Sequence, residues 1–192
     1  MAAHRYWRIR SPTANPFGLS EVQMRTAVGG ADVTSGGAAI ASGNYAGYPP
    51  ANCFDDDNAT LWTTYLVAVP VGGHWVGYDF GAGGDRDIVE FVLRSRSDGF
   101  AGEAPRDPIF EWSDNGSTWT RSGDAAGVSW SVAETKVFRT AAPIYARSQQ
   151  QSARVVSAVI PGARVEQLVA RVVSTVADAP PAAARPVVFV IT

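Results

Sequence analysis

Short hydrophobic runs with alternating polar positions recur along the chain as far as residue 142. In residues 6–10, Trp7 and Ile9 alternate with Tyr6, Arg8 and Arg10, which is the two-residue period of a strand buried on one face. Comparable runs, rich in aromatic and β-branched residues, are separated by clusters of Gly, Pro, Asn and Asp, the signal of turns between strands. The runs that predict strands are residues 6–10, 21–26, 75–80, 88–94, 109–112, 118–121, 128–132 and 135–139.

Asn115 and Gly116 stand between two of these runs and predict a hairpin, because both residues tolerate the positive φ of a tight turn. No stretch before residue 143 has a helical period. Short strands with turn signals between them are typical of an all-β domain, either a β-sandwich or a jelly roll.

The composition changes near residue 142, after all six Trp and 18 of the 19 Gly. Residues 1–142 carry 11 basic and 16 acidic residues, a net charge of −5, whereas residues 143–192 carry five Arg and two acids, a net charge of +3. We predict a globular domain over residues 1–142. Residues 143–192 have too few large apolar side chains to close a core, and we predict that they form an arm.

The predicted arm contains a repeat: residues 146–159 recur at residues 163–176, with nine of 14 positions identical. Val165, Leu168, Val169 and Val172 in the second copy also have helical spacing. The high valine content favours extended segments, although the alternative of a helix stays open. Valine-rich segments without a core of their own need a partner surface, because their edges would otherwise aggregate.

Several functional classes are disfavoured by the composition. A net charge of −2 gives no electrostatic reason to expect a nucleic-acid partner. The single cysteine, Cys53, excludes a disulfide scaffold and a multi-cysteine zinc site. No run approaches the roughly 20 apolar residues that span a membrane, and residues 1–10 lack the apolar centre of a signal peptide. We therefore expect a protein made in a cytoplasm, without membrane insertion.

Three consecutive acids, Asp55, Asp56 and Asp57, lie just before Thr60. Adjacent carboxylates repel one another unless solvent or a cation screens them. Calcium prefers carboxylate, hydroxyl and carbonyl oxygens, and Asp55, Asp57 and Thr60 supply such oxygens within one short loop. A solvated acidic turn is the alternative interpretation.

Three segments resemble motifs of discoidin or coagulation-factor type-C domains, which are galactose-binding-like domains. They are Phe-Asp-Asp-Asp-Asn-Ala-Thr-Leu-Trp at residues 54–62, Trp-Val-Gly-Tyr-Asp-Phe-Gly at residues 75–81, and Ser-Asp-Asn-Gly-Ser-Thr-Trp at residues 113–119. Their order and spacing agree with those of the family. The resemblance implies a jelly-roll β-sandwich with a structural Ca2+ and a ligand site on loops at one end.

The chain departs from the family pattern in two places. Asp56 occupies the position of the usual glycine. Residues 6–10 and 19–22 resemble the family's last strands but stand at the start of this chain, which implies a permuted version of the fold; sandwich termini lie close enough together to allow this. By this match, the family's late acidic calcium ligand corresponds to Glu21, so the resemblance implies a calcium site of Glu21, Asp55, Asp57 and Thr60.

Residues 42–49, 66–74 and 94–107 are the loops that we expect to line a binding edge. Sugar recognition needs an aromatic platform and a few planar polar groups. Tyr65 and Phe100 are available in or beside these loops, and exposed aromatic residues can equally serve subunit contacts. The resemblance places His74, Arg94 and Arg96 among the polar sugar contacts. The predicted glycan-binding residues are Tyr45, Tyr48, His74, Arg94, Arg96 and Asp98.

The pattern Ala-Arg-Val-x-Gln-x-Val in the arm, seen at residues 163–169, resembles arms of small virion proteins of tailed bacteriophages and gene-transfer particles. The resemblance implies a structural protein of the tail, baseplate or particle surface, present in many copies and assembled in a bacterial host cytoplasm. The arm would bind neighbouring virion subunits, and the calcium-stabilised sandwich would bind a host cell-surface polysaccharide.

Two other functions remain as alternatives. One is a carbohydrate-binding accessory module of a bacterial glycan-processing system, which we expect less because we recognise neither a catalytic domain nor an export signal in the sequence. The other is an enzyme that uses Asp55, Asp56 and Asp57. Adjacent residues on one turn cannot flank a scissile bond, which needs two opposed carboxyl groups about 5–10 Å apart, so we expect no catalysis.

Overall fold

The computed structural model describes residues 2–13 and 16–140. In these residues the regular structure is β-strand, apart from two short 3₁₀ turns, η1 (Pro50–Cys53) and η2 (Ala101–Glu103). The predicted arm, its repeat and the boundary near residue 142 lie outside the described residues. The strands are β1 (Tyr6–Ser11), β2 (Gly18–Leu19), β3 (Glu21–Arg25), β4 (Ala38–Ala41), β5 (Trp62–Thr63), β6 (His74–Asp79), β7 (Glu90–Arg94), β8 (Ile109–Ser113), β9 (Thr120–Asp124) and β10 (Thr135–Arg139).

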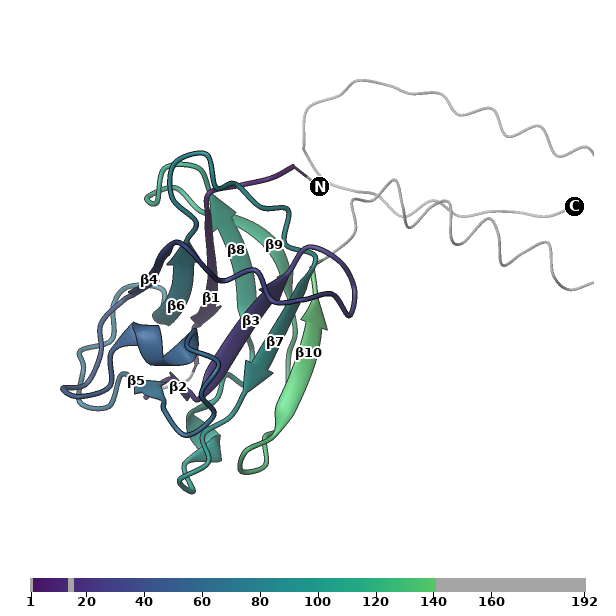
Figure 1. Cartoon of the computed structure of the whole chain (residues 1–192). Helices are drawn as coiled ribbons and strands as arrows, with labels where there is room; N and C mark the ends of the chain where they lie inside the picture. Colours follow the sequence, from purple (N-terminus) through teal and green to yellow (C-terminus); the bar gives the residue numbers. More distant parts are fainter. Residues whose placement is uncertain (1, 14–15, 141–192) are drawn as a thin grey trace, which may run out of the picture. The chain divides into compact units, whose positions relative to one another are not determined.

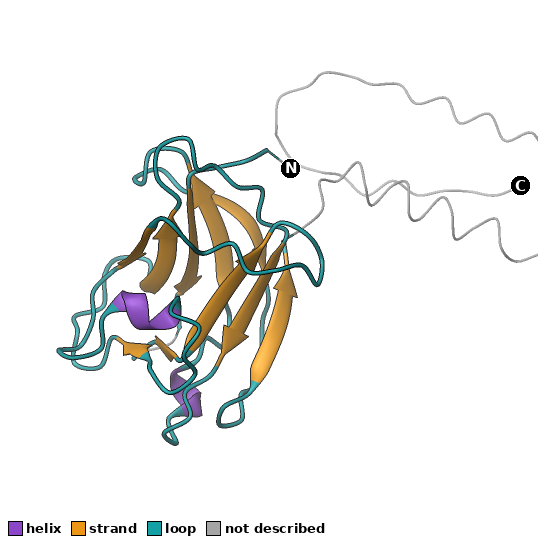
Figure 2. Ribbon diagram, viewed as in Figure 1, coloured by secondary structure: helices purple, strands orange, loops and turns teal. Residues whose placement is uncertain are grey.

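These strands form two main antiparallel sheets and one small one (Figure 1). The larger sheet has the order β4-β6-β1-β8-β9, the second has the order β10-β7-β3, and β2 pairs with β5. The two main sheets lie face to face (Figure 2) and share one hydrophobic core. The all-β prediction is therefore confirmed, in an arrangement consistent with a β-sandwich.

The core follows from the alternation along the strands. Trp7 and Ile9 of β1 are fully buried, while Arg8 between them faces outward from the larger sheet. The ring of Trp7 lies 6.1 Å from that of Phe91 in β7, and Phe91 stacks at 4.6 Å on Phe110 of β8. Side chains of both sheets thus meet in the middle, where burying each one contributes about 2 kcal/mol.

The hairpin predicted at Asn115 and Gly116 is present between β8 and β9. Gly116 has a φ of 69°, and its backbone N–H donates to Ser113 Oγ at 3.0 Å. The side-chain oxygen of Asn115 accepts from the Thr118 backbone at 2.8 Å. These bonds hold a loop longer than the shortest hairpin turn, so the strand predicted to start at residue 118 starts at Thr120.

The prediction of a strand at residues 128–132 is wrong. Its backbone bonds to irregular chain instead of to a strand: the Val128 N–H donates to the Arg106 carbonyl at 2.8 Å. Trp130 Nε1 donates to the Pro105 carbonyl at 2.9 Å, and Ala133 adopts a φ of 56°. The aromatic and β-branched side chains of residues 128–132 therefore belong to a packed loop that precedes β10.

Three strands were not predicted: β2, β4 and β5. Strands β2 and β5 have only two residues each, too few to show a period. Strand β4 is Ala-Ala-Ile-Ala, and alanine has a low strand propensity. It is a strand because it pairs with β6, and a local sequence pattern cannot indicate such pairing.

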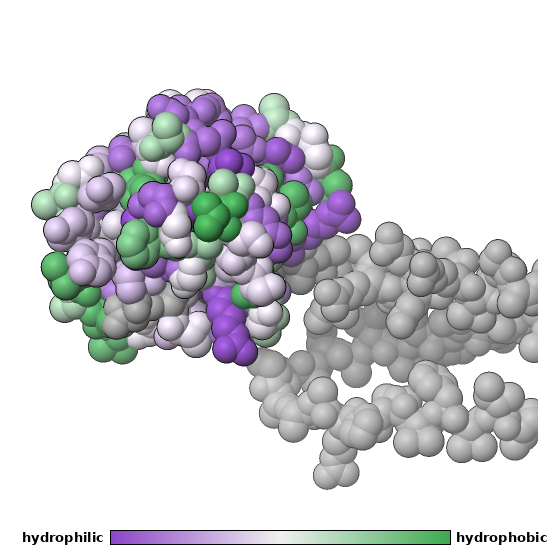
Figure 3. Space-filling model, turned by 90° about the horizontal axis from the view of Figure 1, so that it is seen from below, coloured by the Kyte–Doolittle hydropathy of each residue, from purple (hydrophilic) through white to green (hydrophobic). Residues whose placement is uncertain are grey.

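The segments that follow β4, β5 and β7 come together beside η2, at the lower end of the domain in Figure 1. Seen from below, this end has hydrophobic and hydrophilic side chains interspersed (Figure 3). Among residues 2–13 and 16–140, no helix has the length and apolarity needed to cross a membrane.

Candidate functional site

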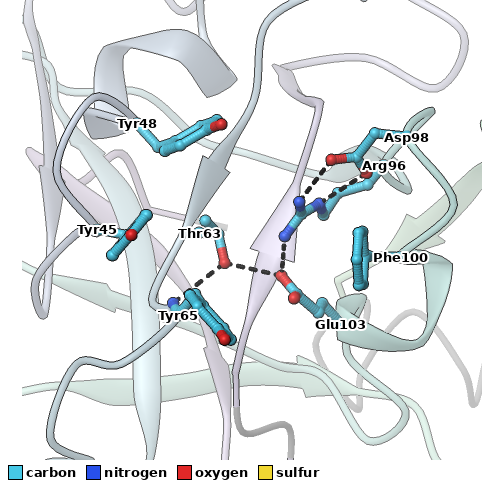
Figure 4. A pocket seen from close by; sticks show the side chains of 8 residues that line it. All are labelled: Tyr45, Tyr48, Thr63, Tyr65, Arg96, Asp98, Phe100 and Glu103. Carbon is cyan, nitrogen blue, oxygen red and sulfur yellow. Dashed lines mark hydrogen bonds and ion pairs between the residues drawn. The ribbon is translucent and has the colours of Figure 1, made fainter.

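A pocket with a cavity volume of about 340 Å³ opens between these loops (Figure 4). Its size is at the lower end of the range for small-molecule sites. The pocket combines aromatic walls with a floor of hydrogen-bonded polar side chains. Its lining residues are Tyr45, Tyr48, Thr63, Tyr65, Arg96, Asp98, Phe100 and Glu103.

The polar floor is a chain of hydrogen bonds centred on Glu103. Thr63 Oγ1 donates to Glu103 Oε2 at 2.7 Å, and Arg96 Nη1 donates to the same oxygen. The other side of the Arg96 guanidinium donates from Nε and Nη2 to the two oxygens of Asp98, at 3.0 and 2.6 Å. Arg96 and Glu103 are both buried, so the floor is pre-organised.

These contacts favour the charged forms of two pocket residues, Asp98 and Arg96. The hydrogen bonds from Arg96 lower the pKa of Asp98, outweighing the opposing effect of burial. Burial acts to lower the pKa of Arg96, but hydrogen bonds to Asp98 and Glu103 outweigh it and raise that pKa. Arg96 and Asp98 therefore form a stable ion pair in the pocket.

Aromatic rings form the walls of the pocket. Tyr45 and Tyr48 are stacked, with ring centroids 5.9 Å apart, and Tyr65 meets Tyr45 edge to face at 5.4 Å. The backbone N–H groups of Tyr45 and Tyr65 both donate to Thr63, which ties this wall to the floor. Phe100 lies at the opposite side in Figure 4, with the Arg96 guanidinium 4.9 Å from its ring centre.

Gly18 of β2 lies against the floor of the pocket, where its lack of a side chain leaves room for the Glu103 carboxylate. A Cβ at this position would lie 2.6 Å from Glu103 Oε2 and 3.2 Å from Thr63 Cβ. Because the first of these approaches is shorter than any ordinary contact, a side chain here would displace the buried carboxylate. The small β2-β5 sheet thus requires glycine for close approach of the Glu103 side chain.

Four of the six predicted ligand residues meet in this pocket: Tyr45, Tyr48, Arg96 and Asp98. Tyr65 and Phe100, which were available but not selected, also line it. Thr63 and Glu103 were missed. Glu103 lies within the predicted loop 94–107, but no local pattern distinguishes it from other surface acids.

His74 does not belong to the pocket, contrary to the prediction. It is fully buried in β6, its Nδ1 lies 3.4 Å from Ser42 Oγ, and burial lowers its pKa. The alternation along the strand indicates this burial, because His74 lies on the same face of β6 as the core residues Val76 and Tyr78.

Arg94 is also outside the pocket. At the end of β7, it donates from Nη1 to Thr135 Oγ1 of β10 at 3.1 Å. With Thr135 it lines a different hollow, on the three-stranded sheet. The chain turns after β7, so Arg96 enters the pocket although it follows Arg94 by only two residues.

The acidic loop brings together three of the predicted metal ligands. Thr60 Oγ1 lies 2.9 Å from Asp55 Oδ2, 3.0 Å from the Asp57 carbonyl oxygen and 3.1 Å from the Asn52 carbonyl oxygen. The Asp57 carboxylate instead accepts the Ala59 backbone N–H at 2.9 Å. Asp57 therefore offers its main-chain oxygen to this cluster, where the sequence suggested its side chain.

Glu21 of β3 is 6% exposed and carries an orphaned oxygen. Its Oε1 accepts the Val22 backbone N–H at 3.0 Å, while the buried Oε2 has no hydrogen-bond partner among the described residues. Burial raises the pKa of Glu21 to about 8, and the charges of Asp55, Asp56 and Asp32 add to this effect. Glu21 thus experiences the negative charge of the acidic loop.

The donors of the acidic loop are oxygen atoms, the type that a hard cation prefers. Within the part of the chain that the structure describes, no three His, Cys, Asp or Glu side chains converge as a metal site would require. A cation here would therefore depend on the Thr60 hydroxyl and on main-chain oxygens as well as on Glu21 and Asp55. Mixed oxygen donors of this kind are those that Ca2+ prefers.

The loop keeps its tight turn without the glycine of the resembling family. Asp56 adopts a φ of 57°, the left-handed conformation that aspartate tolerates better than most residues. The Asp57 and Ala59 backbone N–H groups, which follow Asp56, donate to the Asp55 and Asp57 carboxylates. Asp56 therefore takes up, at some cost in energy, a conformation that glycine adopts without strain.

Comparison with known proteins gives no match: no protein-family model, no curated protein and no solved structure matches the chain. Function therefore has to be argued from the residues. The described part of the chain is an all-β domain with an aromatic and ionic pocket on its loops and with an acidic loop at residues 55–57.

Proposed function

We propose that this chain is a non-catalytic structural protein of a virion whose domain binds a host cell-surface glycan. The pocket carries the binding part of this proposal. Its stacked tyrosines can cover the apolar face of a sugar ring, and Arg96, Asp98 and Glu103 can bond sugar hydroxyls. The groups come from separate loops on a packed scaffold, the usual place for binding residues.

The finer fold assignment is part of the same proposal. A permuted galactose-binding-like jelly roll is supported by the three motif segments and by their positions. The motif at residues 54–62 forms the acidic loop, residues 75–79 lie in β6, and residues 113–119 form the β8–β9 hairpin. In the proposal, Glu21, Asp55, Asp57 and Thr60 hold a structural Ca2+, which stabilises the domain and takes no part in chemistry.

The virion part rests on the sequence of the arm. Its repeat and its resemblance to phage-particle arms support attachment to neighbouring subunits in many copies. Deletion of residues 143–192 should abolish incorporation into particles produced in the native host, measured by mass spectrometry of purified particles. Particles that still contain the truncated chain would contradict the anchoring role.

Glycan binding is tested with the full chain on an array of bacterial surface polysaccharides. Tyr65→Ala should weaken binding about tenfold, because it removes one ring of the aromatic wall. Val71→Ala is the control: Val71 is fully exposed, does not line the pocket, and its loss should leave binding unchanged. Absence of binding to every polysaccharide would contradict the glycan-binding proposal.

A further inference from the structure

The pocket has an excess of negative charge. Its lining includes one cationic side chain, Arg96, and two carboxylates, Asp98 and Glu103. Both carboxylates already bind the guanidinium, so Arg96 has no unpaired charge to offer an anionic ligand. The lining therefore has a net charge of about −1 in a partly desolvated space, where screening by solvent is weak.

The hydrogen bonds of the floor leave an acceptor for a ligand. Thr63 and Arg96 both donate to Oε2 of Glu103, and no bond from a described residue ends on Oε1. The Asp98 side chain is 41% exposed and can accept further bonds at the rim. A cationic ligand would meet the negative charge of these carboxylates favourably and could donate any N–H groups to their free acceptors, whereas a ligand carboxylate would meet two like charges.

The aromatic walls add attraction for a positive group. The Arg96 guanidinium already lies over the face of Phe100 at 4.9 Å, which shows that the pocket geometry accommodates a cation against a ring. Tyr45, Tyr48 and Tyr65 line the opposite side (Figure 4). Cations near aromatic faces gain electrostatic attraction that increases as water is excluded.

We infer that this pocket selects a ligand that carries a positively charged amine, over neutral and acidic ligands of the same size. The shared chemistry is an ammonium group, carried either by an unacetylated amino sugar or by choline. The inference rests on the proposed function in one respect, which is that the ligand binds in this pocket. It goes further by naming the charge that the ligand must carry.

Titration calorimetry of the full chain tests this with four probes. They are a glucosamine oligomer, the matching N-acetylglucosamine oligomer, a galacturonate oligomer and choline, at a mildly acidic pH where the glucosamine amine is protonated. We expect the amine oligomer or choline to bind about tenfold more tightly than the N-acetylated oligomer. Added salt should weaken this preference, and the acidic oligomer should not bind.

Asp98→Asn sharpens the test, because it removes one negative charge at a partly exposed position and keeps the shape of the side chain. It should reduce the preference for the amine several-fold, because the amine oligomer should lose more affinity than the N-acetylated oligomer. Glu103→Gln should act in the same direction. Asp124→Asn is the matched control, since Asp124 is an exposed carboxylate that pairs with Arg121 on β9.

The outcomes separate this inference from the proposed function. Equal or tighter binding of N-acetylated or acidic oligomers would overturn the amine selectivity and support glycan binding. Binding of choline without any sugar would support the ammonium inference and contradict the glycan. If none of the probes binds, the inference is overturned, and the polysaccharide array then decides the proposed function by itself.

Discussion

The pocket and the acidic loop both gather carboxylates, but they balance the charge in opposite ways. In the pocket, Arg96 binds Asp98 and Glu103 directly, so the site is organised by the chain itself. In the acidic loop, the Asp55 carboxylate accepts from the Thr60 hydroxyl and from the Asp57 backbone N–H, and Glu21 keeps an orphaned oxygen. The pocket is organised by ion pairs within the chain, whereas the acidic loop and Glu21 bring together negative charge that a proton on Glu21 or an outside cation would reduce.

The largest expected effect tests the self-sufficiency of the pocket. Arg96→Ala should lower the free energy of unfolding by about 3 kcal/mol, because it leaves the buried Glu103 carboxylate without its cationic partner. Urea unfolding of the full chain measures this loss. Arg121→Ala removes an exposed pair with Asp124 and should cost less than about 1 kcal/mol. Equal losses in the two variants would show that the pocket ion pairs contribute no more than surface pairs.

Calcium tests the dependence of the acidic loop on an ion. At a calcium concentration about 100 times the dissociation constant, binding should stabilise the chain by about 2.7 kcal/mol. Thermal unfolding with calcium and with a chelator measures the difference. Glu21→Gln should greatly reduce this response, whereas Asp98→Asn in the pocket should retain it. The same melting temperature in calcium and in chelator would contradict a calcium site.

The raised pKa of Glu21 predicts the pH dependence of the calcium-free chain. The pKa is about 8 when folded and near its ordinary value when unfolded, so between these values the folded state binds more protons. Stability should therefore fall as pH rises through this window, by up to about 1.4 kcal/mol per pH unit, and level off above about pH 8.

Chemical unfolding in chelator at a series of pH values measures this slope. Glu21→Gln should flatten it, because glutamine does not titrate. A wild-type chain whose stability stays constant or rises through the window would show that Glu21 ionises normally in the folded state.

The smallest effect concerns the turn of the acidic loop. Asp56→Gly should stabilise the chain by about 0.5 kcal/mol, because glycine adopts the φ of 57° without strain and one of the charges near Glu21 is removed. Asp57→Gly is not expected to stabilise, since Asp57 caps Ala59. Precise denaturant midpoints of the two variants distinguish these results. Destabilisation by Asp56→Gly would mean that the Asp56 side chain makes a favourable contact.

Local patterns predicted most of the long strands and the hairpin. The alternation at Trp7 and Ile9 identified β1, since a strand with one buried face repeats every two residues. The same alternation places His74 on the buried face of β6, away from any ligand on the loops. The rule failed at residues 128–132, where β-prone side chains pack a loop, and at β4, which pairing alone makes a strand.

The sequence by itself determined the all-β character, the loops that carry the pocket and the acidic loop, because these depend on neighbouring residues. Only the tertiary structure decided which groups share a site. Glu103 and Thr63 are forty residues apart and meet because Gly18 leaves room between them, while Arg94 and Arg96 separate because β7 ends between them. Such long-range contacts depend on how the sheets pack, and the periodicity of neighbouring residues does not predict them.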